Sequence, residues 1–465
     1  MNNQTKSRTT VPTQEEIVQF LDSLQETEFN RGGANGAGVP GLKPFLEGTV
    51  PEEFKGFYSQ DELDALSQIK GTPRDIEDRM KVKLTEHYLR LSQNSEALRN
   101  LVKARPEETE DLSGEMDPSN QNKYSPVPGL LHKYEMVLLY TAATCSAHCR
   151  YCYRLDLFSK KTGKEMANID KVAEYIVAHN QMVKEFNGKH PETGKDIYPV
   201  HEALLSGGDP LVLSNRRLAR LMIGLAQAGV RTIRIGSKEL AFYPYRFDEN
   251  FFAMIDGVHA LFPDVRILLI THFTHPDEFL AKDDAGHYIQ EGSGYRWMDV
   301  TKNAVEQLIN RRRFMSLENQ TPIIFRVNDN ALSLHILQKE LYRHGIGNHY
   351  IFQCREIEGH KTFAVPVETS WKIFTESQKG LSGVEKHARF VMSTEIGKMQ
   401  VVGVTQGQII FKIFRSPADA GTQGNIIIAR SNPDALWISG YLDRIVSDDT
   451  GILKSVAESV NFVGV

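Results

Sequence analysis

Cysteine is scarce in this chain: only four of the 465 residues are cysteine, and three of those lie within eight residues of one another. A disulfide framework needs cysteines that are spread along the chain, so this distribution excludes one. The three clustered cysteines, Cys145, Cys149 and Cys152, instead predict a site that binds metal through thiolates.

Long apolar runs and an excess of positive charge are also absent. No segment approaches the roughly 18 consecutive apolar residues that a membrane-spanning helix needs. Residues 1–14 are polar and contain no apolar core segment, so no signal peptide is expected. The net charge is −5 and the isoelectric point is near 6.3. Nucleic acid and anionic membranes are therefore not expected as partners, and we expect a cytoplasmic protein.

From residue 135 onward, short apolar runs alternate with helical patterns. Apolar residues make up 41% of the chain, enough for a large core. Helical patterns over 168–187, 214–228 and 331–344 each stop at a glycine. Nearly continuous apolar runs favour parallel strands that are covered on both faces. The runs occupy 136–144, 201–207, 231–236, 266–273, 322–328 and 349–354.

Six such units predict an α/β fold, a partial parallel (β/α)6 barrel, because a complete barrel needs eight. Catalytic residues of such barrels lie where the strands end. The polar residues that follow the runs are Cys145, Ser206 to Asp209, Ser237, His272, Asp329 and Arg355.

The barrel is predicted to span residues 126–415, with extensions on both sides. Residues 1–125 are expected to form a helical N-terminal extension, with weak helical character over 1–30 and a helix over 72–97. The glycine-rich segment 31–41 is interpreted as a flexible loop, since no strand precedes it as a phosphate-binding loop would require. The proline-rich segment 104–129 is predicted to be extended, and residues 416–465 to form a small C-terminal extension.

The cysteine motif has the spacing C-x3-C-x2-C. Three thiolates from one tight loop can bind three irons of a [4Fe–4S] cubane and leave the fourth iron open for S-adenosylmethionine (SAM). Reductive cleavage of SAM then gives a 5′-deoxyadenosyl radical. A zinc site is the alternative, with His148 as a fourth ligand, but zinc sites usually pair their cysteines as C-x2-C. Cys354 lies in an apolar run and is interpreted as a core residue.

Seven sequence blocks in order resemble the lysine 2,3-aminomutase family of radical SAM enzymes, over residues 75–415. They are SPVPGLLHKY (125–134), the cysteine loop through Arg154, LLSGGDPL (204–211), RIGS (234–237) with Pro244 and Arg246, THFTHPDE (271–278), NQTPIIFRVND (319–329) and YIFQC (350–354).

The resemblance assigns roles to individual residues. The three cysteines would ligate the cluster. The segment Ser206, Gly207, Gly208 and Asp209 would receive the methionyl amine of SAM, with glycines for close backbone approach and a carboxylate for the ammonium. His272 and Gln320 would lie near the ribose of SAM, and Tyr151 could pack on the adenine. Arg154 would hold the carboxylate of the substrate, which suits its planar fork.

Family members also bind pyridoxal 5′-phosphate (PLP) through a lysine that follows a glycine-rich run. Lys398 is the candidate here, although the run is reduced to Gly397. The family's phosphate-binding pair, in the motif H-R-Y-P-D-R, corresponds to His132-Lys133-Tyr134-Glu135-Met136. One arginine is replaced by Lys133 and the other is missing.

The resemblance also bears on the substrate. Lysine-specific members hold the terminal ammonium of lysine with two aspartates, and the corresponding positions here are Arg355 and Ser393. A cation at that place would repel lysine. We therefore expect a 2,3-aminomutase that acts on a different amino acid, and a dicarboxylic one would pair with Arg355. An internal partner for Arg355, such as Glu356 or Glu358, is an equal alternative.

Two other functions remain open at this stage. One is a PLP-independent radical SAM enzyme that abstracts hydrogen from a small substrate, and the other is a non-enzymatic iron–sulfur binding protein. The resemblance implies a small-molecule amino-acid substrate and an electron donor such as flavodoxin or ferredoxin, and it leaves a homo-oligomer open.

Overall fold

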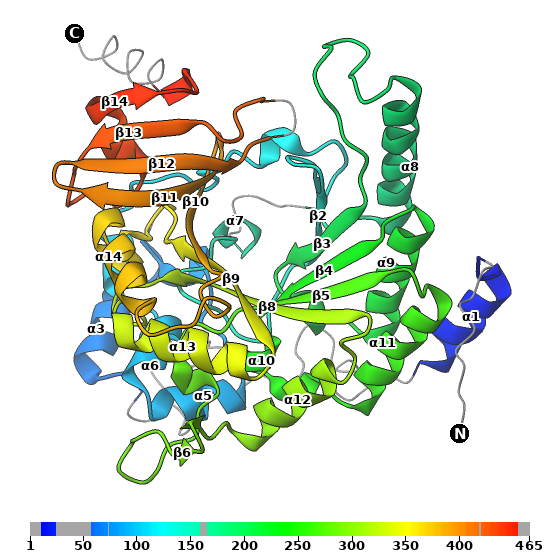
Figure 1. The fold of residues 1–465 in the computed structure, drawn as a ribbon. Helices are drawn as coiled ribbons and strands as arrows, with labels where there is room; N and C mark the ends of the chain where they lie inside the picture. The colour runs from blue at the N-terminus through cyan, green and yellow to red at the C-terminus, as the bar shows by residue number, and fades with distance from the viewer. Residues whose placement is uncertain (1–10, 25–56, 73, 159–164, 418–419, 454–465) are drawn as a thin grey trace.

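The computed structural model describes residues 11–24, 57–72, 74–158, 165–417 and 420–453. One mixed sheet of 12 strands organises this part of the chain, in the order β1-β2-β3-β4-β5-β8-β9-β10-β11-β12-β13-β14. Figure 1 shows the sheet curving around the short helix α7 (Leu155–Phe158). None of the described helices is long and apolar enough to cross a membrane.

Seven neighbouring strands of the sheet run parallel. They are β2 (Val137–Ala142), β3 (Glu202–Gly207), β4 (Thr232–Ser237), β5 (Arg266–Thr271), β8 (Met315–Ile323), β9 (Ile346–Gln353) and β10 (Arg389–Thr394). Each connection to the next strand contains a helix of at least 11 residues: α8 (Ile169–Glu185), α9 (Asn215–Gln227), α11 (Glu249–Leu261), α12 (Asp299–Ile309), α13 (Ala331–Arg343) and α14 (Val367–Ser377). The predicted α/β class with a large parallel sheet is confirmed.

The helix α9 shows how the local sequence sets these boundaries. Ser214 caps its first turn by accepting a hydrogen bond from the amide of Arg217 at 3.2 Å. Leu218, Met222 and Leu225 recur at helical spacing and are fully buried. The helix then ends before Gly229, whose φ of +98° is in the region that favours glycine.

Two of the predicted elements are wrong. The fifth strand was predicted over 322–328 but lies at 315–323, because MSLENQTPI alternates buried and partly exposed side chains and its polar residues hide the strand. Asp329 therefore does not follow a strand directly. The helix predicted over 72–97 is broken into α4 (Ile76–Arg79) and α5 (Glu86–Gln93), with Thr85 capping the second.

The seventh parallel strand, β10, was not predicted, and an antiparallel layer continues from it. The strands of this layer are β11 (Gly397–Thr405), β12 (Gln408–Arg415), β13 (Ile426–Arg430) and β14 (Ile445–Asp448). The two-residue strand β1 (Leu130–Leu131) extends the other edge. A separate small hairpin joins β6 (Gln290–Glu291) and β7 (Gly294–Tyr295).

The N-terminal helices pack on the same apolar core as the sheet. Besides α4 and α5 they are α1 (Gln14–Ser23), α3 (Gln60–Ile69) and α6 (Glu96–Val102); the short helix α10 (Glu239–Phe242) follows β4. Leu101 of α6, Leu205 of β3 and Phe411 of β12 all belong to one buried cluster. The predicted loop at 31–41 lies outside the described residues, and the predicted division at 125/126 and 415/416 stays a prediction.

Candidate active site

The cysteine loop follows β2 and is anchored to the N-terminal helices. Arg150, between the second and third cysteines, donates from Nε to Glu108 Oε1 at 3.1 Å and from Nη2 to Glu108 Oε2 at 2.6 Å. Its Nη1 donates to the carbonyl of Met80 at 2.8 Å. Both side chains of the ion pair are almost completely buried, at 2% and 6% exposed. The loop is thus held by a charge-assisted pair that excludes water.

The three thiols line one cavity at the carboxyl end of the parallel strands, which we call the cysteine cavity. Within the described chain, no three His, Cys, Asp or Glu side chains are arranged to hold a single metal ion. A cubane makes a different demand, because each thiolate binds a separate iron. His148, the expected alternative zinc ligand, instead has its Nδ1 2.7 Å from the carbonyl oxygen of Lys81.

Gly207 and Gly208 are required by the packing of the chain on itself. A Cβ atom on Gly208 would lie 2.1 Å from the carbonyl oxygen of Thr144, and one on Gly207 would lie 2.6 Å from that of Ala142. The amide of Gly208 donates to Ala142 at 2.6 Å, so the two backbones touch. These glycines therefore let β3 approach the start of the cysteine loop, a role that the resemblance did not indicate.

Asp209 lines the cysteine cavity, but its carboxylate is also occupied by the protein. Oδ1 accepts from the amide of Leu211 at 2.9 Å, and Oδ2 accepts from the amide of Lys238 at 2.7 Å and from Ser237 Oγ at 3.0 Å. Burial raises the pKa of Asp209 to about 6 despite these donors. The carboxylate fixes the ends of β3 and β4 relative to each other.

His272 and Tyr151 meet at the boundary of the cavity. The hydroxyl of Tyr151 lies 3.0 Å from His272 Nε2 and 3.0 Å from Thr274 Oγ1. Burial holds the pKa of His272 well below its usual range, with Lys238 adding to the shift, so the imidazole is neutral. Lys238 in turn donates to the carbonyl of His272 at 2.6 Å and to Glu278 at 2.7 Å. A buried ion pair therefore fixes this histidine.

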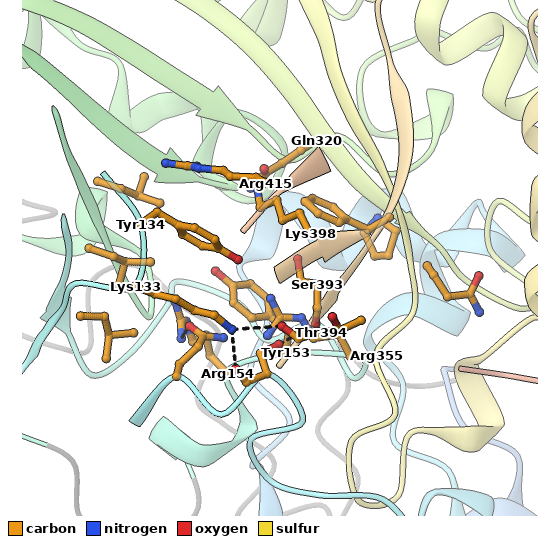
Figure 2. Close-up of a pocket in the computed structure, with 18 of the residues that line it drawn as sticks. Lys133, Tyr134, Tyr153, Arg154, Gln320, Arg355, Ser393, Thr394, Lys398 and Arg415 are labelled. Carbon is orange, nitrogen blue, oxygen red and sulfur yellow. Dashed lines mark hydrogen bonds between the residues drawn. The ribbon is translucent and has the colours of Figure 1, made fainter. Parts of the chain in front are cut away.

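A second cavity adjoins the first, and we call it the lysine cavity (Figure 2). It contains Lys398, Arg355 and Ser393, all singled out by the resemblance. Both cavities are lined by the same seven residues at their junction: Tyr151, Tyr153, Arg154, Leu204, Arg234, His272 and Gln320. The residues that the resemblance assigned to the cluster, SAM, PLP and the substrate all line one of these two adjoining cavities, whereas Asp329 lines neither.

The lysine cavity is strongly cationic. Of the described residues that line it, six are Lys or Arg and none is Asp or Glu. These basic residues are Lys133, Arg154, Arg234, Arg355, Lys398 and Arg415. Such a lining favours a ligand that carries more than one negative charge.

Lys398 projects into this cavity from β11 (Figure 2). Its Nζ lies 4.2 Å from the centre of the Tyr350 ring and 5.5 Å from that of Phe352. Burial lowers the pKa of Lys398 well below its usual range, and Arg415 and Arg234 add to the shift. A neutral amine is the form that attacks a carbonyl, so the surroundings prepare Lys398 as a nucleophile.

Lys133 has a structural role at the position where the family binds phosphate. Its Nζ donates to the carbonyl oxygens of Ser119 at 2.8 Å, Thr394 at 3.0 Å and Glu395 at 2.8 Å. An ammonium has three donors, so all are used. Burial lowers the pKa of Lys133 to about 8. The residue joins β10 to the segment before β1.

Arg154 and Arg355 lack carboxylate partners within the described chain. Arg154 donates from Nη1 to Gln121 Oε1 at 3.0 Å and to the hydroxyl of Tyr140 at 2.9 Å, while its Nε is buried without a hydrogen-bond partner. No ion pair or hydrogen bond of the Arg355 side chain is found among the described residues; it lies over the ring of Tyr153.

Neither of the two internal partners considered for Arg355 forms an ion pair or hydrogen bond with it among the described residues. The carboxylate of Glu356 accepts from Ser439 Oγ at 2.7 Å. Glu358 lies beside Arg79, which donates to its carbonyl oxygen. Cys354 directly follows β9. Its side chain is 3% exposed, as expected for a core residue, and it also lines the lysine cavity.

Sequence reasoning missed three residues of the site: Tyr153, Arg234 and Arg415. Arg234 carried a signal, since it interrupts the apolar run of β4. Tyr153 directly follows the last cysteine and hydrogen-bonds to the side chain of Ser206. No sequence pattern pointed to Arg415, because it reaches Lys398 only through the pairing of β11 with β12.

Comparison with known proteins shows similarity to L-lysine 2,3-aminomutases. No protein-family model matches the chain. A putative L-lysine 2,3-aminomutase from Aquifex aeolicus (strain VF5) is 31% identical over 355 residues, which cover 76% of this chain and 84% of the relative. L-lysine 2,3-aminomutase from Fusobacterium nucleatum is 30% identical over 271 residues, 58% of this chain and 52% of that enzyme.

A third relative is L-lysine 2,3-aminomutase from Acetoanaerobium sticklandii, 28% identical over 66% of this chain and 64% of the enzyme. The solved structure of TYW1 with a lysine-pyruvate adduct bound is 14% identical, with a TM-score of 0.30 over 57% of this chain and 78% of that chain. This structural similarity is too weak to indicate a shared fold. The match to the Aquifex aeolicus relative is extensive in both chains, and this chain belongs to the lysine 2,3-aminomutase family of radical SAM enzymes.

Proposed function

We propose that this protein is an aminomutase that moves the α-amino group of a dicarboxylic amino acid, such as glutamate or aspartate, to the neighbouring carbon. Membership of the radical SAM family implies a [4Fe–4S] cluster and SAM, and the proposal adds PLP. The observation that carries it is the lining of the lysine cavity, which among the described residues has four arginines and two lysines but no carboxylate. A lysine substrate would bring a second ammonium into that field, which is unfavourable.

The residues present suit each of these groups. Cys145, Cys149 and Cys152 would hold the cluster, since they line one cavity from a single loop. SAM would bind beside them, between the 206–209 segment and His272. Lys398 would hold PLP, because its side chain faces the cavity and its pKa is lowered by burial. When bound, these groups supply a 5′-deoxyadenosyl radical and a carbonyl that binds the amino group.

The remaining residues would orient the substrate. Arg154, at the junction of the cavities, would hold the α-carboxylate next to the source of the radical. Arg355 would hold the second carboxylate, because its guanidinium lines the cavity and forms no ion pair among the described residues. The neutral His272 and the hydroxyl of Tyr151 would hydrogen-bond at the junction without adding charge.

One observation favours a second function. Lys133 donates its three hydrogen bonds to backbone carbonyls. It therefore has no donor left for a phosphate at the position where the family binds one. A PLP-independent radical SAM enzyme that abstracts hydrogen from a small anionic substrate would also suit the cationic cavity. Both proposals include an electron donor such as flavodoxin or ferredoxin, and both are compatible with a homo-oligomer.

The test is a panel of amino acids with protein that has been reconstituted anaerobically with iron, sulfide, SAM and PLP. We expect β-amino acid products from glutamate or aspartate and none from lysine. Treatment with borohydride and mass spectrometry then separates the two functions: a PLP adduct on Lys398 supports the aminomutase. Turnover of lysine would contradict the proposed substrate, and the absence of any adduct would favour the PLP-independent enzyme.

A further inference from the structure

Lys398 and Arg415 are paired residues on neighbouring antiparallel strands, β11 and β12. The register of the two strands shifts directly after this pair, between Lys398 and Met399, so the pair lies at a β-bulge. Both side chains line the lysine cavity, as Figure 2 shows. Arg415 is therefore the cation that strand pairing places beside the predicted PLP lysine.

Glu135 holds Arg415 in place and leaves part of its guanidinium free. Nε of Arg415 donates to Glu135 Oε2 at 3.1 Å and Nη2 to Oε1 at 2.6 Å. Nη1 makes no hydrogen bond within the described chain. Arg415 is mostly buried, at 14% exposed, whereas Glu135 is 57% exposed. Glu135 lies in the segment whose family counterpart carries the phosphate arginines, so an arginine from β12 now reaches the same place.

Arg234 supplies a second cation to the same cavity. It lies on β4, where Nη1 donates to Glu202 Oε1 at 3.0 Å. Its Nε is buried and has no hydrogen-bond partner within the described residues. An unsatisfied buried donor is costly, and a bound anion would satisfy it.

We propose that Arg415 and Arg234 form the phosphate-binding site for the PLP that Lys398 holds. This inference rests on the proposed function, since it assumes PLP. Guanidinium groups suit phosphate because their planar fork donates two parallel hydrogen bonds. Lys133 cannot do so while three carbonyls occupy its Nζ. Arg154 and Arg355 then remain for the substrate.

The test compares PLP with pyridoxal, which has the same aldehyde but no phosphate. The full-length reconstituted protein is incubated with each aldehyde over a range of concentrations and treated with borohydride. Mass spectrometry then gives the fraction of Lys398 modified and hence the Kd of each aldehyde. In the wild type we expect PLP to bind at least about ten-fold more tightly than pyridoxal. Arg415→Gln and Arg234→Gln should each reduce the ratio of PLP to pyridoxal affinity about ten-fold. Pyridoxal serves as the reference because each arginine also lowers the pKa of Lys398, and the loss of that effect acts on both aldehydes alike.

Two further variants control the experiment. Arg389→Gln removes a neighbouring cation that packs on Phe414 and does not line the cavity, so both affinities should stay unchanged. Glu135→Gln removes the negative charge beside Arg415, while the amide oxygen of Gln can still accept a hydrogen bond from the guanidinium and keep it in place. The ratio of PLP to pyridoxal affinity should therefore increase. If Arg415→Gln does not fold, the ratio of PLP to pyridoxal affinity in Glu135→Gln tests the phosphate site instead.

The outcomes are distinguishable. If both arginine variants keep the wild-type ratio of PLP to pyridoxal affinity, the phosphate site is wrong, while an adduct on Lys398 still supports the proposed function. If they raise only the KM of the amino acid, the two arginines bind substrate carboxylate instead and the inference is overturned. If wild-type protein forms no adduct with either aldehyde, the PLP part of the proposed function fails and the inference fails with it.

Discussion

Arg355 packs its guanidinium on the ring of Tyr153, 4.8 Å from the ring centre. Arg154 packs on the same ring at 4.7 Å, so one tyrosine separates two like charges. Tyr153 directly follows Cys152, which places both arginines next to the cysteine loop. An anionic substrate held by both would therefore lie where a radical formed at the cysteine cavity can reach it.

Replacing Arg355 tests the substrate class. In Arg355→Gln we expect the KM for glutamate or aspartate to rise about 10–100-fold, because one charge-assisted hydrogen-bonded pair is lost. Product formation and 5′-deoxyadenosine are measured by chromatography with mass detection. Arg430→Gln, an exposed arginine at the end of β13, serves as the control and should leave the KM unchanged. Undiminished activity of Arg355→Gln with an acidic substrate would rule out this role.

Replacing Cys149 tests the cluster. Anaerobically reconstituted wild-type protein should contain about four irons per chain. Cys149→Ala should lose most of this iron and all reductive cleavage of SAM, because one of three thiolate ligands is gone. Cys354→Ser, a cysteine outside the motif, should keep the iron. Normal SAM cleavage by Cys149→Ala would refute the cluster assignment.

Glu108 is expected to stabilise the cysteine loop that binds the cluster, although it lies 37 residues before Cys145 in the sequence. Removing one partner of a buried ion pair leaves the other charge uncompensated and costs about 3–5 kcal/mol. Glu108→Ala should therefore lower the urea midpoint of unfolding and the iron content after reconstitution. Glu107→Ala removes the exposed neighbour and should change the free energy of unfolding by less than about 0.5 kcal/mol. Equal iron contents in the two variants would contradict the anchoring role.

The lowered pKa of Lys398 predicts an unusual pH dependence of adduct formation. An ordinary lysine is protonated below its pKa of about 10.4, so its reaction with an aldehyde slows about ten-fold per unit fall in pH. Because burial lowers the pKa of Lys398, its neutral form persists to lower pH, and the rate should fall less steeply between pH 9 and pH 7. Borohydride trapping at each pH measures this rate, and Lys398→Ala provides the blank. A ten-fold fall per pH unit over this range would contradict the prediction.

Much of the site could be predicted because it follows strand ends. Cys145 and His272 follow β2 and β5 directly or after a short turn, and the parallel order of those strands gathers them at one edge. Helix boundaries such as Ser214 and Gly229 could be predicted too, since caps and stops are local chemistry. The strand β8 was misplaced because its polar residues, of which Gln320 lines both cavities, conceal the strand in the sequence.

By itself, the sequence determined the cysteine spacing, the alternation of strands and helices, and the replacement of expected acids by Arg355 and Ser393. Only the tertiary structure decided which charges are satisfied and which face the cavity. Lys133 is saturated by the carbonyls of Ser119, Thr394 and Glu395. Arg415 reaches Lys398 through the pairing of β11 and β12. Both depend on contacts between segments far apart in the chain. Local patterns fix the elements, but the pairing of strands sets which side chains become neighbours.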